Sequence, residues 1–499
     1  MSQLSIASST GLVIPAFVRG RTTYGSLVEH GGRSRRPSFQ APNAADLLPD
    51  IPLSDPRALL DLNALAFDEI TAYLDELGRR LALDGNDLMA EALELGASWS
   101  DLTPPVLRTA YESLPSIFSR ASVREIAERS VGIEYLERWV PHPLPDGRPA
   151  AVRAFGARSV HIIAGNSPLI AAMTVIRSAI TRSDAIVKIP SNDPLTMLAI
   201  ARTMEAMAPD HPITRHLCVL YWKGGDRAFE DGLYQPHVVE KIVAWGGMHS
   251  LMHVRQYLQP GLELIALDPK LSATIIGADA FTDDANLPEV AARAALDVGA
   301  MNQIACANAR VIYAQTGTDE VGLDRARVFG TMLYNELQRL PEQISTPAAH
   351  LDEELLALVQ AVRTTDDGTE VIGGRDGEGA VIVSAVPEPV PFHTRLSGRT
   401  VNVVPVDSID EVLPRITAMT QTVGVYPEEL QKQLRDILPL HGTQRVVALG
   451  CAASPNLTLP QDAIEPIRRM VKWIVDEGRD IPPISQRGTT APALNGRPS

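Results

Sequence analysis

The sequence is poor in cysteine and in positive charge. Its 499 residues include three cysteines, Cys218, Cys306 and Cys451, which lie far apart and form no Cys-x-x-Cys pair. This spacing argues against a disulfide framework and a structural zinc site, and it is typical of a protein in a reducing compartment. The formal net charge is −15 at pH 7. Binding to nucleic acid therefore has no electrostatic support.

Long apolar runs are absent as well. No segment approaches the roughly 18 consecutive apolar residues that a transmembrane helix needs, and the N-terminus lacks the basic and apolar regions of a secretion signal. The composition is 45% hydrophobic and 21% charged, which is ordinary for a globular protein with a large core. The length indicates two or three compact units. We therefore expect a cytoplasmic protein without a membrane span.

The N-terminal half falls into an extension and a long α/β region. Residues 1–54 predict a small hairpin and a loosely held linker, and the basic stretch 19–36 predicts a solvated loop. Apolar side chains at helical spacing predict a helical zone from Asp55 to about Ser130. After Ser159, predicted strands (160–164, 185–189, 217–221, 239–244, 263–267) alternate with predicted helices (169–181, 195–208, 227–233, 249–258). This alternation predicts a parallel, doubly wound α/β sheet, and we place the domain at 55–272.

The C-terminal half predicts a second α/β domain over 273–450. Its strands include 273–280, 380–384, 401–406 and 445–449, and the glycine- and acid-rich stretch 368–379 predicts an exposed loop. Residues 451–480 predict a helical return with its helix at 463–477. The tail 481–499, rich in Pro, Ser, Thr and Gly, predicts disorder.

Ligands of doubly wound sheets bind beyond the carboxyl ends of the strands. The predicted loops there are 165–168, 190–193, 223–226 and 245–248, and all four carry turn residues. No Gly-x-Gly-x-x-Gly fingerprint is present. On these residues alone, the region predicts no more than a nucleotide or a similar ligand.

Cys306 lies between a predicted helix, 287–298, and a predicted strand, 311–313, among small and amide side chains. A thiol in such a junction can be a nucleophile, and the alternative is a small buried residue. The neighbouring Asn302 and Gln303 either line the site or cap the helix end, and we favour the cap. Cys218 and Cys451 are interpreted as structural.

The order of these segments resembles the aldehyde dehydrogenase superfamily, and within it the long-chain acyl-CoA reductases of bacterial bioluminescence (the LuxC-like family). The resemblance spans roughly residues 130–475. It is carried by HIIAGNSPLIAAMTVIRSAITRSDAIVKIPSND, GGDRAFEDGLYQPHVVEKIVAWGGMHS, ELIALDPKLSATIIG and NQIACANARVIY. It implies an aldehyde dehydrogenase-like α/β fold, in which a doubly wound cofactor-binding domain accompanies an α/β catalytic domain that carries the nucleophilic cysteine.

The resemblance also implies site residues. Cys306 would take up the acyl group as a thioester, and Asn166 would bind the developing oxyanion together with the Cys306 backbone N–H. The alternative for Asn166 is an Asx-turn before Pro168. The matched cofactor-binding positions comprise a ribose loop and two glycine turns near the phosphates and nicotinamide: Lys188, Ser191, Asn192, Gly224, Gly225, Gly246 and Gly247. Each glycine could equally serve only a tight turn.

Three departures from the superfamily pattern are informative. Ala266 stands where aldehyde-oxidising members carry the glutamate that activates water, so hydrolysis of the thioester is poorly served unless Asp268 substitutes. Asn192 replaces the glutamate that grips the ribose 2′-hydroxyl, and Lys188 could attract a 2′-phosphate, which favours NADPH with NADH as the alternative. The segment 395–399 replaces a second carboxylate loop, so the ribose contact expected there cannot be assigned.

These features predict NADPH-dependent reduction of a long-chain fatty acyl-CoA or acyl thioester to the aldehyde. A partner enzyme could deliver the acyl group, and the resemblance implies a homo-oligomer without a metal. Two alternatives stay open. One is an aldehyde dehydrogenase that forms acid, and the other is an inactive scaffold that only binds a nucleotide.

Overall fold

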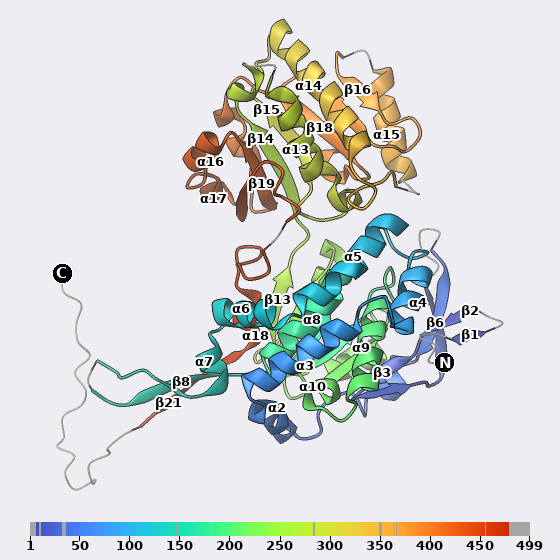
Figure 1. The fold of residues 1–499 in the computed structure, drawn as a ribbon, viewed down its shortest axis with the longest axis vertical. Coiled ribbons are helices and arrows are strands. Elements are labelled where there is room, and N and C mark those ends of the chain that lie inside the picture. The colour runs from blue at the N-terminus through green and yellow to red at the C-terminus, as the bar shows by residue number, and fades with distance from the viewer. Residues whose placement is uncertain are drawn as a thin grey trace.

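The computed structural model describes residues 6–8, 11–31, 36–145, 147–282, 285–348, 352–365, 367–454 and 456–478. Two seven-stranded sheets form the cores of two lobes, which lie one above the other in Figure 1. The tail predicted to be disordered, 481–499, lies outside the described residues. Within the described residues, no helix has both the length and the apolar character needed to cross a bilayer.

The lower lobe contains the predicted doubly wound sheet. Its strand order is β13-β12-β9-β10-β11-β3-β4, and β9 to β13 run parallel. The strands are β3 (Ala16–Val18), β4 (Arg21–Thr23), β9 (Arg158–Ile162), β10 (Asp184–Lys188), β11 (Leu217–Leu220), β12 (Lys241–Trp245) and β13 (Glu263–Leu267). All five parallel strands match predicted ones, because continuous apolar runs suit strands that are buried on both faces.

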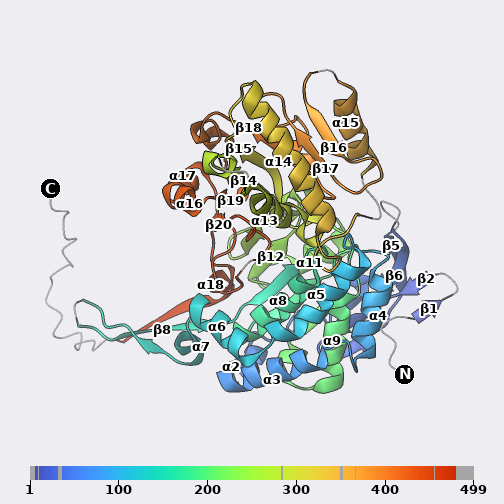
Figure 2. The same ribbon diagram turned by 45° about the horizontal axis from the view of Figure 1, so that its top comes forward.

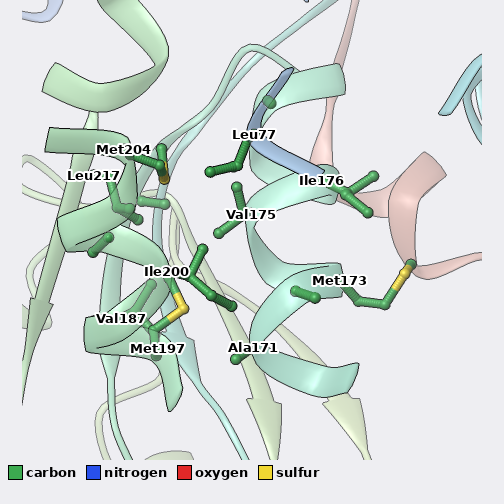
Figure 3. Packing of buried hydrophobic residues seen from close by; sticks show 14 of the residues in the cluster. Leu77, Ala171, Met173, Val175, Ile176, Val187, Met197, Ile200, Met204 and Leu217 are labelled. Atoms are coloured by element: carbon green, nitrogen blue, oxygen red, sulfur yellow. The ribbon is translucent and has the colours of Figure 1, made fainter. Parts of the chain in front are cut away.

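Helices cover both faces of this sheet. In sequence order they are α1 (Ala44–Leu47), α2 (Leu60–Ala64), α3 (Phe67–Arg80), α4 (Asp87–Gly96), α5 (Pro104–Ile117), α6 (Arg120–Ser130), α7 (Ile133–Glu137), α8 (Pro168–Ile180), α9 (Thr196–Met207), α10 (Pro212–Arg215), α11 (Arg227–Leu233) and α12 (Met248–Arg255). Helix α8 begins where the Ser167 hydroxyl accepts a hydrogen bond from the Leu169 N–H at 3.3 Å, with Pro168 as its first residue. Nearly all of α8 is buried, and Val175 points into the core toward Leu77 of α3 and Ile200 of α9, whereas Ile176 points to the opposite side of α8 (Figure 3).

The N-terminal residues include the predicted small hairpin, formed by β3 and β4, but not the predicted loosely held linker. Strands β3 and β4 extend the lower-lobe sheet, while β1 (Ile6–Ser8), β2 (Gly11–Val13), β5 (Leu27–Gly31) and β6 (Ser38–Pro42) form a separate four-stranded sheet. Phe17, Phe39 and Ala41 are fully buried. The linker prediction was wrong because the apolar residues of this segment pack on the distant α/β region, which local patterning does not reveal.

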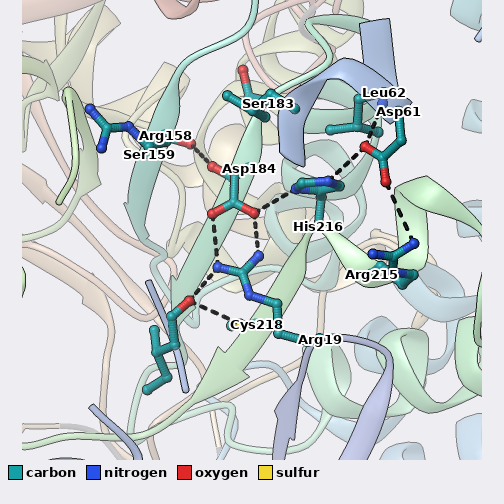
Figure 4. A network of polar contacts seen from close by, with 12 residues as sticks. Arg19, Asp61, Leu62, Arg158, Ser159, Ser183, Asp184, Arg215, His216 and Cys218 are labelled. Carbon is teal, nitrogen blue, oxygen red and sulfur yellow. Dashed lines mark hydrogen bonds and ion pairs between the residues drawn. The ribbon is translucent and has the colours of Figure 1, made fainter. Parts of the chain in front are cut away.

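The basic stretch 19–36 is also more than a solvated loop. The Arg19 guanidinium binds Asp184, which is 1% exposed, and His216 is hydrogen-bonded through Nδ1 to Asp184 (2.8 Å) and through Nε2 to Asp61 (2.9 Å) (Figure 4). Burial alone would raise the pKa of Asp184, but the hydrogen bond from His216 and the charge of Arg19 lower it below its usual value. This network fastens the N-terminal strands to the amino-terminal end of β10.

The upper lobe contains the second sheet, in the order β16-β17-β18-β15-β14-β19-β20. Its strands are β14 (Leu271–Ile276), β15 (Ala309–Ala314), β16 (Glu370–Gly373), β17 (Ala380–Val383), β18 (Thr400–Pro405), β19 (Thr420–Tyr426) and β20 (Arg445–Ala448). Its α-helices are α13 (Leu287–Gly299), α14 (Glu320–Arg339), α15 (Glu353–Thr364), α16 (Glu428–Leu434) and α17 (Leu438–His441). The exposed loop predicted at 368–379 was wrong, because β16 lies within it and pairs antiparallel with β17.

The last described residues return to the lower lobe. Helix α18 (Pro466–Met470) is short, and β21 (Lys472–Glu477) pairs antiparallel with β8 (Ala150–Phe155), which also pairs with β7 (Val140–Pro141). The helix predicted at 463–477 was therefore wrong, since Trp473, Ile474 and Val475 favour a strand where a partner strand is available. These strands project from the body of the molecule as an arm (Figure 2).

Candidate active site

A cavity of about 1180 Å³ is lined by residues of both lobes. Its wall includes the loops at the carboxyl ends of the lower-lobe strands, the loop that carries Cys306, and a C-terminal segment from Asn456 to Asp462. Eight of the nine predicted site residues lie on this wall: Asn166, Lys188, Ser191, Asn192, Gly224, Gly246, Gly247 and Cys306. The ninth, Gly225, is adjacent to the wall and donates its N–H to Glu230 at 3.0 Å.

The Cys306 loop has an unusual backbone. Met301, Asn302 and Gln303 have φ values of 52°, 55° and 63°, so three consecutive non-glycine residues adopt the left-handed conformation. Such a run is strained and persists only where surrounding contacts enforce it. The entry of the chain into the Cys306 turn is therefore fixed by its neighbours and not by local preference.

Asn302 and Gln303 supply those contacts. Asn302 donates to Thr103 Oγ1 at 2.9 Å and accepts from the Thr346 N–H at 3.2 Å. Gln303 donates to the carbonyls of Ala309 (3.0 Å) and Thr400 (2.8 Å), and it accepts from the Thr400 N–H at 2.8 Å. The favoured prediction of a helix cap was wrong, and neither residue lines the cavity, because both side chains turn inward and join the loop to distant segments.

Cys306 is half-buried, and its own loop is held on both sides. The Ser272 hydroxyl donates to the Cys306 carbonyl at 2.7 Å, and the N–H of Ala305 donates to Asn308 Oδ1 at 3.0 Å. Arg310 interacts electrostatically with Cys306, and burial lowers the pKa of Arg310 to about 10 against the opposing effect of that thiol. Arg310 also donates from Nη1 to the Gln303 carbonyl at 2.7 Å. Arg310 was not among the predicted site residues.

Asn166 lies in the loop between β9 and α8, on the cavity wall. Its Oδ1 is buried and accepts no hydrogen bond from any described residue. An Asx-turn requires this oxygen to accept a backbone N–H, so the geometry does not support that alternative. The amide is instead available to a group bound in the cavity.

One end of the cavity is rich in cations. Lys188 lies there with its Nζ 5.5 Å from the centroid of the Trp222 ring, and burial lowers its pKa against the opposing charge of Glu230. Lys223 and His30, the latter from β5, line the same end, and neither was predicted. Burial lowers the pKa of His30, with Asp226 opposing the shift and Lys223 adding to it.

Glu230, a buried carboxylate at this end, already accepts four hydrogen bonds. Glu230, which is 1% exposed, accepts from Trp222 Nε1 (3.1 Å), His253 Nε2 (2.7 Å) and the Tyr257 hydroxyl (3.2 Å), in addition to the Gly225 N–H. Its negative charge is therefore spread over four donors. The two lysines keep their attraction for an anionic ligand.

The glycine turns leave backbone open to a ligand. A Cβ at Gly247 or Gly225 would meet no atom within 4 Å, and one at Gly165 would lie 2.3 Å from Asn192 Oδ1. Close backbone approach and nearby cations are what a dinucleotide phosphate needs. The residues present therefore fit a nucleotide at this end of the cavity.

Comparison with known proteins agrees with this geometry. The family model described as acyl-CoA reductase (LuxC) matches residues 62–473. The chain belongs to the LuxC family. It is therefore an oxidoreductase enzyme, and the family that the sequence resembles is confirmed.

Its curated relatives are long-chain acyl-protein thioester reductases. The protein from Vibrio harveyi is 27% identical over 421 residues, which cover 83% of this chain and 84% of that one. The protein from Photorhabdus laumondii subsp. laumondii is 28% identical over 367 residues, which cover 72% and 71%.

Solved structures confirm the aldehyde dehydrogenase fold. Aldehyde dehydrogenase 21 from Physcomitrella patens, in complex with succinate, has a TM-score of 0.71 at 14% identity and covers 94% of this chain and 98% of its own. The NADP-dependent glyceraldehyde-3-phosphate dehydrogenase from Bacillus halodurans C-125, complexed with NADP, has a TM-score of 0.68 at 12% identity, with 93% and 98% covered.

The other end of the cavity in this LuxC-family enzyme is more apolar. Its wall carries the side chains of Leu169, Ile170, Met173, Trp245, Met301, Leu457 and Leu459. Polar groups border them, since Arg177 lies 5.5 Å from the Trp245 ring centroid and donates to Gln461 Oε1 at 3.0 Å. Gln421 donates to Asp462 Oδ1 at 2.7 Å. These two contacts join the C-terminal segment to both lobes.

The position of the missing glutamate is also clear. Ala266 packs in the lower lobe, while Asp268 lies on the cavity wall with its Oδ2 3.9 Å from Lys270 Nζ. The segment 395–399 does not reach the described cavity wall, because Arg395 binds Asp352 and Glu354 on the surface. The ribose contact of other superfamily members has no equivalent there.

The remaining cysteines lie off the cavity. Cys218 is fully buried in β11, and burial raises its pKa to about 11, whereas Cys451 is exposed after β20. In the described part of the chain, no group of three His, Cys, Asp or Glu side chains could hold a metal ion.

Proposed function

We propose that this LuxC-family enzyme reduces a long-chain fatty acyl thioester to the aldehyde, with Cys306 as the nucleophile and NADPH as the electron donor. The observation that carries the proposal is the shared cavity. It brings Cys306 and Asn166 together with a cationic, glycine-lined nucleotide end and an apolar end. The names of the curated relatives, long-chain acyl-protein thioester reductases, support the same reaction.

In the first step the Cys306 thiolate attacks the acyl carbonyl. Negative charge moves to the carbonyl oxygen, where the Asn166 amide and the Cys306 N–H would stabilise it. Collapse of this intermediate expels the donor thiolate, which takes up a proton, and leaves the acyl group on Cys306.

In the second step the thioester is reduced. A reduced nicotinamide, when bound, supplies the hydride that adds to the acyl carbon. Asn166 would again hold the oxygen, and collapse releases the aldehyde and regenerates the Cys306 thiolate. Neither step consumes water, so the alanine at position 266 suits a reductase better than an enzyme that forms acid.

The choice of NADPH rests on charge. Lys188 and Lys223 line the nucleotide end, and a ribose 2′-phosphate would gain from both charges. Asn192 is neutral, and the Asp101 carboxylate to which it donates at 3.3 Å is paired with Arg36. NADH remains the alternative donor.

The acyl donor is either a CoA thioester or an acyl group carried by a partner protein. The arm formed by β7, β8 and β21 supports a homo-oligomer, because Val475 is 56% exposed on a projecting strand whose outer edge has no partner strand among the described residues.

The proposal predicts that Cys306→Ala abolishes acyl-CoA-dependent oxidation of NADPH. The matched control is Cys451→Ala, which removes an exposed thiol outside the cavity and leaves the rate within about twofold of wild type. Persistent activity in purified Cys306→Ala would reject Cys306 as the nucleophile. The assay should scan acyl-CoAs from acetyl to palmitoyl, since chain-length preference is read in the same experiment.

The position of Asp268 on the cavity wall favours one rival, an aldehyde dehydrogenase in which this carboxylate activates water. Steady-state assays with an aldehyde and NADP⁺ or NAD⁺ separate the two functions. Acid formation without CoA supports the rival, and aldehyde oxidation that requires CoA supports the reductase. Nucleotide binding with an unreactive Cys306 would instead identify an inactive scaffold.

A further inference from the structure

Asp297 is a fully buried carboxyl group that the proposed chemistry does not use. It lies in the last turn of α13 and has no exposed surface. Its Oδ1 accepts the N–H of Ala452 at 2.8 Å, and the N–H of Gly450 also bonds to the carboxylate. Its Oδ2 has no partner among the described residues. Burial raises the pKa of Asp297 to about 6, although these bonds and Arg445 oppose the shift.

The unpartnered oxygen faces a second unpartnered oxygen. A Cβ placed on Gly424 of β19 would lie 2.5 Å from Asp297 Oδ2 and 3.3 Å from Thr274 Oγ1. Thr274 lies opposite Gly424 on the neighbouring strand β14, and its hydroxyl is buried without a described partner. Glycine at position 424 thus leaves the two oxygens room to approach one another. A protonated Asp297 could donate to this hydroxyl, whereas an ionised one could only accept.

Asp297 also joins two parts of the active site. Its backbone carbonyl accepts from Asn308 Nδ2 at 3.3 Å, and Asn308 holds the Ala305 N–H next to Cys306. Its side chain holds the turn 450–452, which leads directly into the cavity-wall segment that ends at Asp462. A change in the carboxyl group therefore acts on the wall through this turn.

We propose that Asp297 is a positioning residue for the acyl end of the cavity. The ionised carboxylate of Asp297 docks the turn 450–452, whereas the protonated carboxyl group turns toward Thr274 and loosens that turn. The assignment of this end to the acyl group rests on the proposed function. A charged acceptor binds an N–H more strongly than a neutral one does, so the two forms hold the wall with different strength.

The charged and titratable surroundings favour this response. Arg445 of β20 interacts electrostatically with Asp297, lines the cavity, and donates to the carbonyl of Ala452 at 2.6 Å. Arg293, one helical turn earlier on α13, packs against Gly450, and Cys451 lies in the turn itself. From β14 and β19, the closest described side-chain positions are the uncharged Thr274 and Gly424. Arg445 is thus the cation that stabilises the ionised form.

The test uses the full chain and two measurements. The first is the KM for an acyl-CoA between pH 5.5 and 8, with the KM for NADPH as an internal reference. The second is amide hydrogen exchange of residues 446–462 over the same pH range, corrected for the intrinsic exchange rate. This measurement requires no enzyme activity. The variants are Asp297→Asn, which carries a donor in place of Oδ2, and Gly424→Ala, which displaces the carboxylate. Glu429→Gln is the control, since it neutralises an exposed carboxylate on α16 of the same lobe.

In wild type, the acyl KM should rise about fivefold as the pH falls through 6, the size of a change in one hydrogen bond. Protection of 446–462 should fall in parallel. Asp297→Asn should show the low-pH values at every pH, Gly424→Ala should raise the acyl KM at pH 8, and Glu429→Gln should keep the wild-type profile.

A wild-type pH profile in Asp297→Asn, in either measurement, would overturn the proposal. If Asp297→Asn does not fold, an unchanged acyl KM and exchange in Gly424→Ala would do so. If the protein lacks reductase activity but its hydrogen exchange depends on pH and this dependence requires Asp297, the proposed function is refuted and the positioning role remains supported.

Discussion

Gln303 offers the most direct test of how the Cys306 loop is held. Replacing it with methionine keeps the length of the side chain and removes both polar atoms. The change deletes three buried hydrogen bonds, two with the backbone of Thr400 and one with that of Ala309. The Thr400 N–H and two carbonyls would lose a partner in a site with no exposed surface.

The expected cost follows from these contacts. A net hydrogen bond contributes about 1 kcal/mol, and a buried group left unpaired costs about 1–3 kcal/mol more. Gln303→Met should therefore lower the free energy of unfolding of the upper lobe by about 3–5 kcal/mol. The left-handed backbone at Gln303 would lose the contacts that enforce it, so alkylation of Cys306 should also change in rate before the protein unfolds.

Urea denaturation, followed by far-UV circular dichroism, measures the first effect, and iodoacetamide modification measures the second. The matched control is Gln433→Met, a substitution on an exposed position of α16 that should stay within about 0.5 kcal/mol of wild type. A loss below about 1 kcal/mol for Gln303→Met, together with unchanged alkylation, would refute the view that this side chain fixes the loop.

Two further predictions concern the lower lobe. Asp184→Asn should destabilise the protein by about 3 kcal/mol at pH 7, because it leaves Arg19 and His216 without their buried partner. The folded state lowers the pKa of Asp184, so its stabilising contribution is present above pH 4 and is lost on acidification. The urea midpoints of wild type and variant should therefore converge below that pH. A difference in urea midpoint that stays constant with pH would contradict this. Lys223→Ala should raise the KM for NADPH about tenfold and leave the KM for NADH nearly unchanged. Equal changes for both dinucleotides would show that Lys223 does not contact the 2′-phosphate.

The parallel strands were predictable because strands that are buried on both faces have continuous apolar runs in the sequence. The elements that were missed have no such local signature. The apolar run Trp473-Ile474-Val475 of β21 is also compatible with a helix, and the pairing of β21 with β8 joins residues more than 300 positions apart in the sequence. In the same way, β3 and β4 owe their position to contacts of Phe17 with the distant α/β core.

The site residues were likewise predictable only where their position follows from the order of segments along the chain. Loop order along the chain brought Cys306, Asn166 and Lys188 to one predicted site, and the cavity wall contains all three. Lys223 had a signal, since it begins a loop that the sequence placed at the carboxyl edge of the sheet. His30 and Asp297 had none, because their roles arise from tertiary contacts. The interpretation of Asn302 and Gln303 was wrong for the same reason, as their partners Thr103 and Thr400 lie 199 and 97 residues away.

These distant partners have a consequence for catalysis. Asn302 reaches Thr103 at the start of α5 in the lower lobe, while Gln303 reaches Thr400 in the upper lobe. Since Asn166 belongs to the lower lobe and Cys306 to a loop of the upper one, the two groups face one cavity only when the lobes are docked. The strained backbone at Met301 can persist only in that docked state, because the contacts that enforce it come from both lobes. Partial separation of the lobes should therefore relax the loop and inactivate Cys306 before either sheet unfolds.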